Sequence, residues 1–273
     1  MPPETPSTGS SRRTALEAQV RRTSEPTLIA SVQRALRLLE VVGEHPAGIT
    51  AKCLARNTGL ALSTTYHLLR TLVHEGYLVK LDDGAFIVGE QVTGLHDSAQ
   101  AQQLRAKIRG VMVELREDLN AAIYLARYED GEVQVDEIVD SPRTPRVDAW
   151  VDFRQAAHAT AVGKCLLAGL SKDERADHFR RHPPEDLTPR TITGVRELVE
   201  RPPSELVADT EEYSLGTACL AARVQCATSP VTLAISFPAR KLATTDDYVR
   251  PLTAAADEIS RALALAGDRV CWN

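Results

Sequence analysis

Apolar residues recur at helical spacing near the start of the chain and predict two short helices. From Ser31, the residues that fall on one face at three- and four-residue intervals are Val32, Ala35, Leu36, Leu39 and Val42. His45-Pro46 and Gly48 then end this helix. A second helix is expected from an N-cap at Thr50 to about Asn57, and Thr58-Gly59 supplies the following turn.

A third helix and a hairpin complete this pattern. Ser63 is the expected N-cap, and the apolar side of the helix holds Thr65, Leu68, Leu69 and Leu72. The opposite side holds Ser63, His67, Arg70 and His74. After Gly76, two strand-like runs at 77–81 and 85–88 flank Asp82-Asp83-Gly84, a turn sequence typical of hairpins. Three short helices and a hairpin predict a winged helix-turn-helix.

The rest of the chain mixes helical and alternating patterns. A long helix is expected over 97–119, followed by strands at 122–127 and 132–139 around Asp130-Gly131. Further helices are expected at 161–170, 172–181, 194–201 and 246–266, and further strands at 207–208, 218–225 and 231–237. This order predicts an antiparallel sheet packed with helices, an α+β sensor-like domain.

The chain is therefore expected to hold two domains. A flexible tail rich in Pro, Ser and Thr covers 1–27, and the winged helix-turn-helix covers 28–95. A linker helix over 96–119 leads to an effector-binding and oligomerisation domain over 120–273.

Composition narrows the class of protein. None of the 273 residues begins an apolar run long enough to span a membrane, so a cytoplasmic protein is expected. The five cysteines form no C-x-x-C pair and the histidines do not cluster, so we expect reduced thiols, no metal and no cofactor. The net charge of −5 argues against bulk attraction to nucleic acid, and residues 28–95 hold six basic and six acidic side chains.

Candidate DNA contacts follow from the helix-turn-helix geometry. The second helix of the pair enters the major groove, so base contacts are expected from Ser63, Thr64, Tyr66, His67 and Arg70. Arg70 is the candidate for bidentate contact with guanine. Phosphate contacts are expected from Arg34, Arg37, Lys52, Arg56 and Lys80.

Three stretches together resemble the IclR family of bacterial regulators over residues 31–265. Ser31-Val-Gln-Arg-Ala-Leu-Arg-Leu-Leu39 is similar to the first helix of that family. Residues 58–72, followed by Glu75-Gly-Tyr-Leu78, are similar to its turn and recognition helix. His158-Ala-Thr-Ala-Val-Gly-Lys-Cys-Leu-Leu-Ala168 and Glu212-Tyr-Ser-Leu-Gly-Thr-Ala-Cys-Leu-Ala221 are similar to its effector-domain signature.

The resemblance implies a GAF-like effector domain that binds a small organic ligand, often a carboxylate. It implies a homodimer or a dimer of dimers that binds double-stranded, partly palindromic operators, and we expect the regulator to be a repressor. It also implies ligand contacts at Ala161, Val162, Gly163, Cys219 and Ser236. The N–H groups at a helix N-terminus favour an anion, and Gly163 would permit its close approach.

Two departures from the family pattern bear on the ligand. Ala156-Ala157 precede His158, and Ser236-Phe-Pro replaces a longer serine-glycine ending. Both predict a pocket for a larger or less polar ligand than a simple keto acid. Bound ligand is expected to shift the helix over 97–119 and so change the separation of paired recognition helices.

Two other functions stay open. His158 with Cys165 or Cys219 could form a thiol nucleophile and its base, although cysteines in such apolar runs are usually buried hydrophobes. Alternatively, the winged helix docks a protein partner and has lost DNA binding, which the neutral charge and the acidic Asp82-Asp83 would suit. We expect a regulator and not an enzyme.

Overall fold

The computed structural model describes residues 28–147, 151–244 and 246–267. The chain divides into two compact units, the first ending at His96 and the second beginning at Asp97. The tail predicted for residues 1–27 lies outside the described residues.

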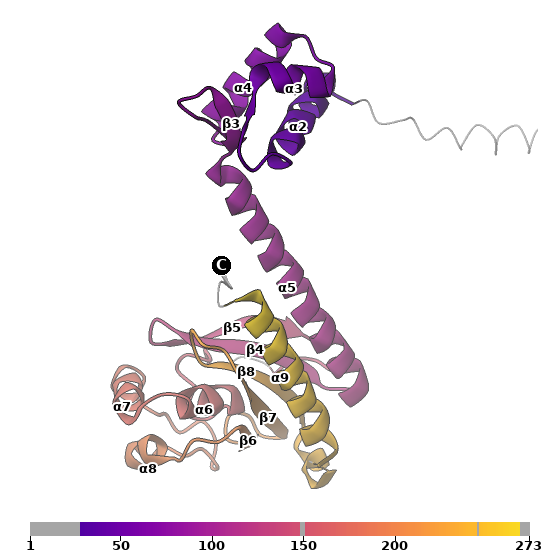
Figure 1. Ribbon diagram of the computed structural model, residues 1–273. Helices are drawn as coiled ribbons and strands as arrows, with labels where there is room; N and C mark the ends of the chain where they lie inside the picture. The colour runs from indigo at the N-terminus through magenta and orange to yellow at the C-terminus, as the bar shows by residue number, and fades with distance from the viewer. Residues whose placement is uncertain (1–27, 148–150, 245, 268–273) are drawn as a thin grey trace, which may run out of the picture. The chain divides into compact units, whose positions relative to one another are not determined.

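The first unit is the predicted winged helix-turn-helix (Figure 1). Helices α2 (Ala30–Gly43), α3 (Ala51–Thr58) and α4 (Leu62–His74) surround a core that includes the fully buried Leu38, Leu54 and Leu69. Strands β2 (Leu78–Lys80) and β3 (Ala85–Val88) form the wing, and a two-residue strand β1 (Ile49–Thr50) pairs with β3. β1 was not predicted, because two residues are too few to show alternation.

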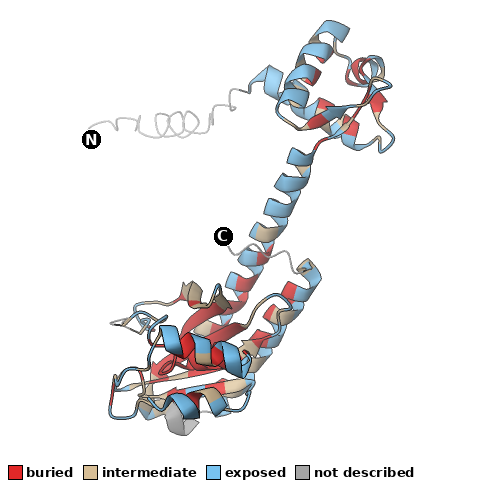
Figure 2. Cartoon of the chain, turned by 90° about the vertical axis from the view of Figure 1, so that its left-hand side faces the viewer, coloured by how far each residue is buried: buried red, intermediate tan, exposed pale blue. Residues whose placement is uncertain are grey.

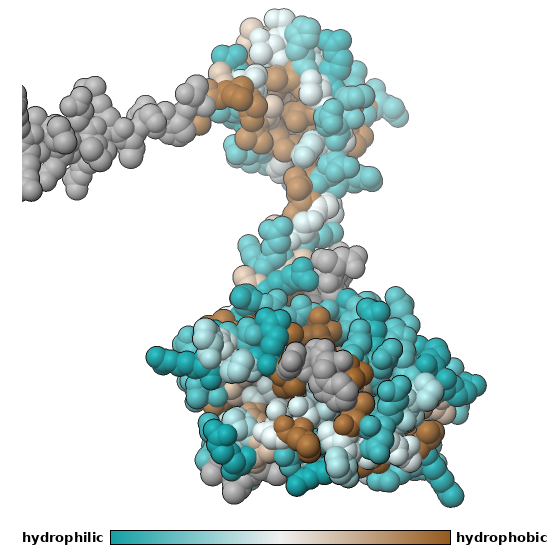
Figure 3. Space-filling view, turned by 180° about the vertical axis from the view of Figure 1, so that it is seen from behind, coloured by the Kyte–Doolittle hydropathy of each residue, from teal (hydrophilic) through white to brown (hydrophobic). Residues whose placement is uncertain are grey.

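The inward face of α2 differs from the prediction. Leu38 and Val42 are buried, whereas Val32 is 50% and Leu36 54% exposed. The buried face is thus rotated around the helix, because Leu38 and Val42 join the core formed with α3, α4 and β3, which cover only part of the apolar surface of α2. Apolar side chains are left on the surface of this unit, as the brown areas of Figure 3 show.

Of the two predicted helix caps, one is confirmed and one is corrected. Thr50 is the N-cap of α3, as predicted, although its side chain makes no capping hydrogen bond. Helix α4 begins at Leu62 after the N-cap Ala61, so Ser63 lies within its first turn. The predicted turn is confirmed at Gly59, which ends α3 with a φ of 70° that a side chain would disfavour.

Helix α5 (Glu90–Leu119) is longer than predicted. It starts seven residues before the expected position 97, since no proline interrupts residues 90–96 and Glu90 places an acid in the first turn. Most residues between 91 and 103 are exposed, whereas Leu104, Ile108, Val111, Met112 and Leu115 are buried (Figure 2). Its second half therefore belongs to the core of the second unit.

The second unit is built on the predicted antiparallel sheet, with strand order β5-β4-β8-β7-β6. The strands are β4 (Ala122–Glu129), β5 (Glu132–Val139), β6 (Leu206–Thr210), β7 (Thr217–Val224) and β8 (Val231–Pro238). The helices are α6 (Ala161–Ala168), α7 (Lys172–Arg181), α8 (Val195–Glu200) and α9 (Asp246–Ala266), with a short 3-10 helix η1 (Ala239–Thr244) after β8.

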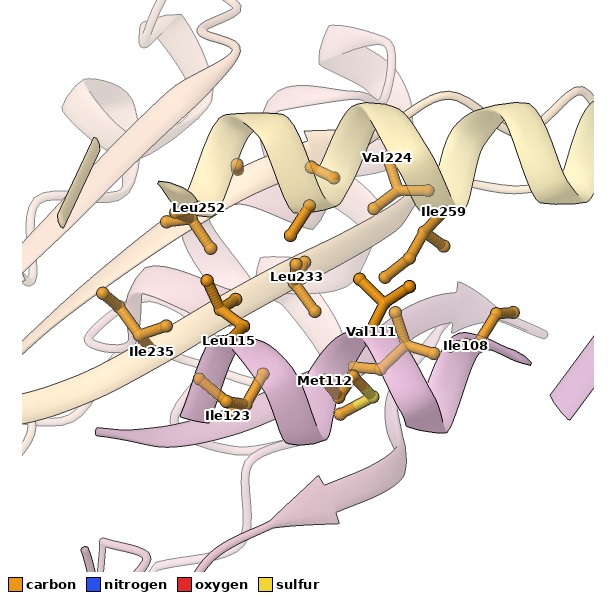
Figure 4. Packing of buried hydrophobic residues seen from close by; sticks show 14 of the residues in the cluster. Ile108, Val111, Met112, Leu115, Ile123, Val224, Leu233, Ile235, Leu252 and Ile259 are labelled. Atoms are coloured by element: carbon orange, nitrogen blue, oxygen red, sulfur yellow. The ribbon is translucent and has the colours of Figure 1, made fainter. Parts of the chain in front are cut away.

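The sheet is covered on both faces. Ile123 and Leu233 point towards the second half of α5 and α9, where they pack with Val111, Leu115 and Ile259 (Figure 4). The alternate residues pack against α6 on the other face. Because β4 and β8 are buried on both faces, they carry almost continuous apolar runs.

Candidate functional sites

The outer face of α4 carries most of the predicted base-contacting residues. Ser63, Tyr66, His67 and Arg70 are exposed and Thr64 is half-buried. Thr65 and Leu69 point into the core and anchor the helix. Arg70 donates from Nη2 to Nδ1 of His67 at 3.0 Å, so the two side chains lie together on the outer face.

The predicted phosphate-contacting residues are also on the surface. Arg34, Arg37, Lys52, Arg56 and Lys80 are all exposed on α2, α3 and β2. None of the five forms an ion pair within the described part of the chain, so their charges are available to a polyanion. In the acidic wing turn, Asp83 accepts a hydrogen bond from the N–H of Ala85 at 2.9 Å, which gives this carboxylate a role in closing the hairpin.

A second candidate site lies between the sheet and α6. Its floor is the sheet face that carries Tyr124, Ala234 and Cys219, and its roof is the first turn of α6 with two aromatic side chains. The lining residues are Tyr124, Val147, Phe153, Thr160, Ala161, Val162, Asp209, Tyr213, Cys219, Ala234 and Ile235. The pocket is thus mainly apolar and aromatic, with one carboxyl group.

Three of the five predicted ligand contacts line this pocket, namely Ala161, Val162 and Cys219. Ser236 lies at its edge, where its Oγ is 3.1 Å from the hydroxyl of Tyr124. That hydroxyl also accepts a hydrogen bond from the N–H of Val147 at 2.7 Å. Tyr124 therefore joins the strand floor to the loop that borders the pocket.

Gly163 has a different role from the expected one. A Cβ at this position would lie 2.4 Å from the Cα of Ala157, so the glycine permits close packing of two backbone segments. Its N–H donates to Oγ1 of Thr160, the N-cap of α6, at 3.0 Å. The N–H groups left for a ligand at this helix end are those of Ala161 and Val162.

Among the lining residues that the structure describes, Asp209 is the only charged one, and it is 2% exposed. Burial raises the pKa of its carboxyl group to about 6, although the group accepts a hydrogen bond from the N–H of Glu212 at 2.8 Å. Behind it, Lys164 and Glu212 form a buried ion pair at 2.6 Å. The charge of Lys164 is therefore already balanced by Glu212.

Sequence reasoning missed Tyr124, Phe153, Asp209 and Tyr213 as pocket residues. Tyr124 could have been found, because it alternates with the core residues Ile123 and Leu125 in a strand that was predicted. Phe153 and Tyr213 lie in loops, where no periodic pattern assigns an inward direction.

Cys165 and Cys219, the two cysteines considered as nucleophiles, lie in apolar surroundings. Burial raises the pKa of Cys165 to about 11 and that of Cys219 well above its ordinary value, so neither is a thiolate at neutral pH. Nε2 of His158 is 2.8 Å from the carbonyl oxygen of Glu185 and donates to it. Within the described residues, His, Cys, Asp and Glu side chains form no group of three that could hold a metal ion.

An exposed helix-turn-helix and a small apolar pocket in a separate α+β unit are the features of a transcriptional regulator with a sensor domain. Comparison with known proteins identifies the family of regulators to which the chain belongs. Residues 31–82 match the IclR helix-turn-helix domain, and residues 96–263 match the C-terminal domain of the bacterial transcriptional regulator IclR. The chain belongs to the IclR family, as its motifs predicted.

Individual relatives cover nearly the same length. The acetate operon repressor of Salmonella typhimurium is 26% identical over 248 residues, which are 87% of this chain and 90% of the relative. A transcriptional regulator from Rhodococcus sp. RHA1 is 25% identical with a TM-score of 0.54 and covers 88% of this chain and 99% of its own. An IclR homologue from Microbacterium hydrocarbonoxydans, solved with 4-hydroxybenzoate, has the same fold at 22% identity and a TM-score of 0.53, and covers 86% of this chain and 99% of its own.

One further finding concerns membranes. Among the residues that the structure describes, no helix has the length and apolar character that a membrane crossing requires.

Proposed function

We propose that this regulator represses transcription by placing α4 in the major groove of its operator. The observation that carries the proposal is the outer face of α4, where Tyr66, His67 and Arg70 are exposed while Thr65 and Leu69 anchor the helix. The exposed cations on α2, α3 and β2 hold the phosphates on either side. A cytoplasmic location and the absence of enzymatic activity are part of the same proposal.

Substitution of Arg70 tests this role. Loss of a bidentate contact with guanine costs about 1–3 kcal/mol, so Arg70→Ala is expected to weaken binding to a promoter fragment by about 5- to 150-fold. Arg196→Ala is the matched control, because Arg196 is an exposed arginine of α8 in the second unit. Equal promoter binding by Arg70→Ala and wild type would instead favour the protein-docking role for the winged helix.

The effector is proposed to bind between α6 and the sheet. The aromatic and apolar lining supports a ligand less polar than a simple keto acid. A carboxylate on such a ligand would be met by the N–H groups of Ala161 and Val162 at the start of α6. Thermal unfolding and promoter binding, each measured with a panel of aromatic acids beginning with 4-hydroxybenzoate, test the effector class. A panel that changes neither quantity contradicts it.

Pairing of two copies is proposed to occur through the exposed apolar side of α2. Leu28, Ile29, Val32 and Leu36 are each at least half exposed, which is unfavourable for a surface left in water. A two-fold pair would present two α4 helices to half-sites about one DNA turn, roughly 34 Å, apart on a palindromic operator. Bound effector would change that separation through α5. Light scattering of the pure protein measures the copy number.

A further inference from the structure

A second cavity in the sensor unit carries a strong positive charge. It has a volume of about 510 Å³ and lies at the end of the sheet where β8 runs into η1. Arg143, Arg146, Arg240 and Lys241 line it, and none of the lining residues that the structure describes is acidic. A cavity of this size is within the range of small-molecule sites, about 300–1,000 Å³.

The two arginines from the loop after β5 are held in place by that loop. Ser141 and Thr144 exchange backbone hydrogen bonds at 3.1 and 3.0 Å, and their hydroxyls are 2.8 Å apart. Arg143 lies inside this closed turn. Arg146 donates from Nε and Nη2 to the carboxylate of Asp140 at 2.6 and 3.3 Å, which orients its guanidinium and neutralises part of its charge.

The other two cations come from η1. The N–H of Ala239, the first residue of η1, donates to the carbonyl of Gly216 at 2.8 Å and fixes this segment to the loop before β7. Arg143 and Arg240 are exposed, and neither makes a hydrogen bond or ion pair with another described residue, so two guanidinium groups at one cavity are available to a ligand. Cations presented on fixed segments lose little entropy when they bind an anion.

From this arrangement we propose that the cavity, which we call the cationic basin, binds a small oxyanion with two or more negative charges. Planar carboxylate groups and tetrahedral phosphate groups both present pairs of oxygens that a guanidinium group binds with two hydrogen bonds. The site is additional to the apolar pocket under α6, where Asp209 is the one charged residue in the described part of the lining. The four cations gather around one cavity, which suits a small anion, whereas DNA phosphates extend along a strand and need cations spread along it.

The basin adjoins the apolar pocket. Val147 lines both cavities, and the Tyr124 hydroxyl connects the two through Ser236 and Val147. An anion that moves the 141–147 loop would thus displace Val147 in the apolar pocket. The basin is therefore suited to bind a second ligand that modifies the response to the effector.

Calorimetric titration of the full chain with citrate and with pyrophosphate tests the proposal and separates carboxylate from phosphate ligands. Wild type is expected to bind one or both at low salt, more weakly as salt rises. Arg143→Gln/Arg240→Gln is expected to lower that affinity about tenfold or more, since charge-assisted hydrogen bonds are lost. Arg196→Gln, which removes an exposed arginine elsewhere in the same unit, is expected to bind like wild type.

Three results would overturn the proposal. The first is that wild type binds neither probe at millimolar concentration and low salt. The second is that the double variant, with its folding verified by circular dichroism, binds both probes as tightly as wild type. The third is that the double variant loses affinity for duplex DNA while its affinity for the probes is unchanged, which would make the basin a DNA contact.

Discussion

The close packing of Gly163 against Ala157 gives a sharp prediction for the sensor unit. In Gly163→Ala, the new Cβ would lie 2.3 Å from the carbonyl oxygen and 2.4 Å from the Cα of Ala157. Ordinary contacts begin at 3.4 Å, so a backbone segment must move by about 1 Å. Both segments are fully buried, which leaves little room for that movement.

The two opposing energies can be compared. Alanine gains about 1 kcal/mol over glycine inside a helix, while overpacking of a buried site costs about 1–3 kcal/mol and more when backbone must shift. We expect a net destabilisation of about 1–2 kcal/mol, which lowers the melting temperature of a unit of this size by about 2–8 °C. Because Ala161 and Val162 move with the helix start, effector affinity is expected to fall as well.

The matched control is Gly110→Ala in α5. No atom lies within 4 Å of a Cβ built at Gly110, so only the gain in helix propensity applies. Scanning calorimetry of the full-length variants is expected to show a lower melting temperature for Gly163→Ala than for wild type. For Gly110→Ala the melting temperature is expected to equal or exceed that of wild type. If Gly163→Ala melts at or above the wild-type temperature, the argument from backbone packing is wrong.

Three further predictions concern charge, burial and the α2 surface. Burial raises the pKa of Asp209 to about 6 from 3.8, so the folded protein binds this proton more tightly than the unfolded chain. The resulting stability, up to about 3 kcal/mol, is complete below about pH 4 and is lost as the pH rises through 6. Denaturant titrations at a series of pH values measure how the free energy of unfolding depends on pH. Asp209→Asn is expected to make this free energy depend less on pH between 4 and 6, and an unchanged dependence would contradict the burial argument. Lys164→Met leaves Glu212 buried and unpaired, which costs about 3–5 kcal/mol, and Lys164→Met/Glu212→Gln is expected to recover most of the loss. Leu36→Ala is expected to change monomer stability by less than about 0.5 kcal/mol but to weaken self-association, whereas Leu38→Ala costs about 2–5 kcal/mol in unfolding.

The local pattern of apolar, polar and turn residues in the sequence determined much of this fold. Helical spacing, the Asp-Gly turns and the alternation of β-branched and aromatic residues predicted the α-helices and all strands but β1, because each of these signals lies within a few residues of chain. The 3-10 helix η1 was not predicted. The outward direction of Tyr66, His67 and Arg70 was predictable for the same reason: Thr65 and Leu69 mark the opposite face of one helix.

Tertiary contacts decided what the local pattern left open. Val32 and Leu36 have the spacing of core residues, yet they are exposed, since periodicity defines an apolar side and only the neighbouring helices determine which part of it is covered. Gly163 was placed correctly at the start of a helix, but the segment packed against it is known only from the fold. The basin arginines at 143 and 240 are distant in sequence, and the sheet brings their two loops to one end because β4 lies between β5 and β8.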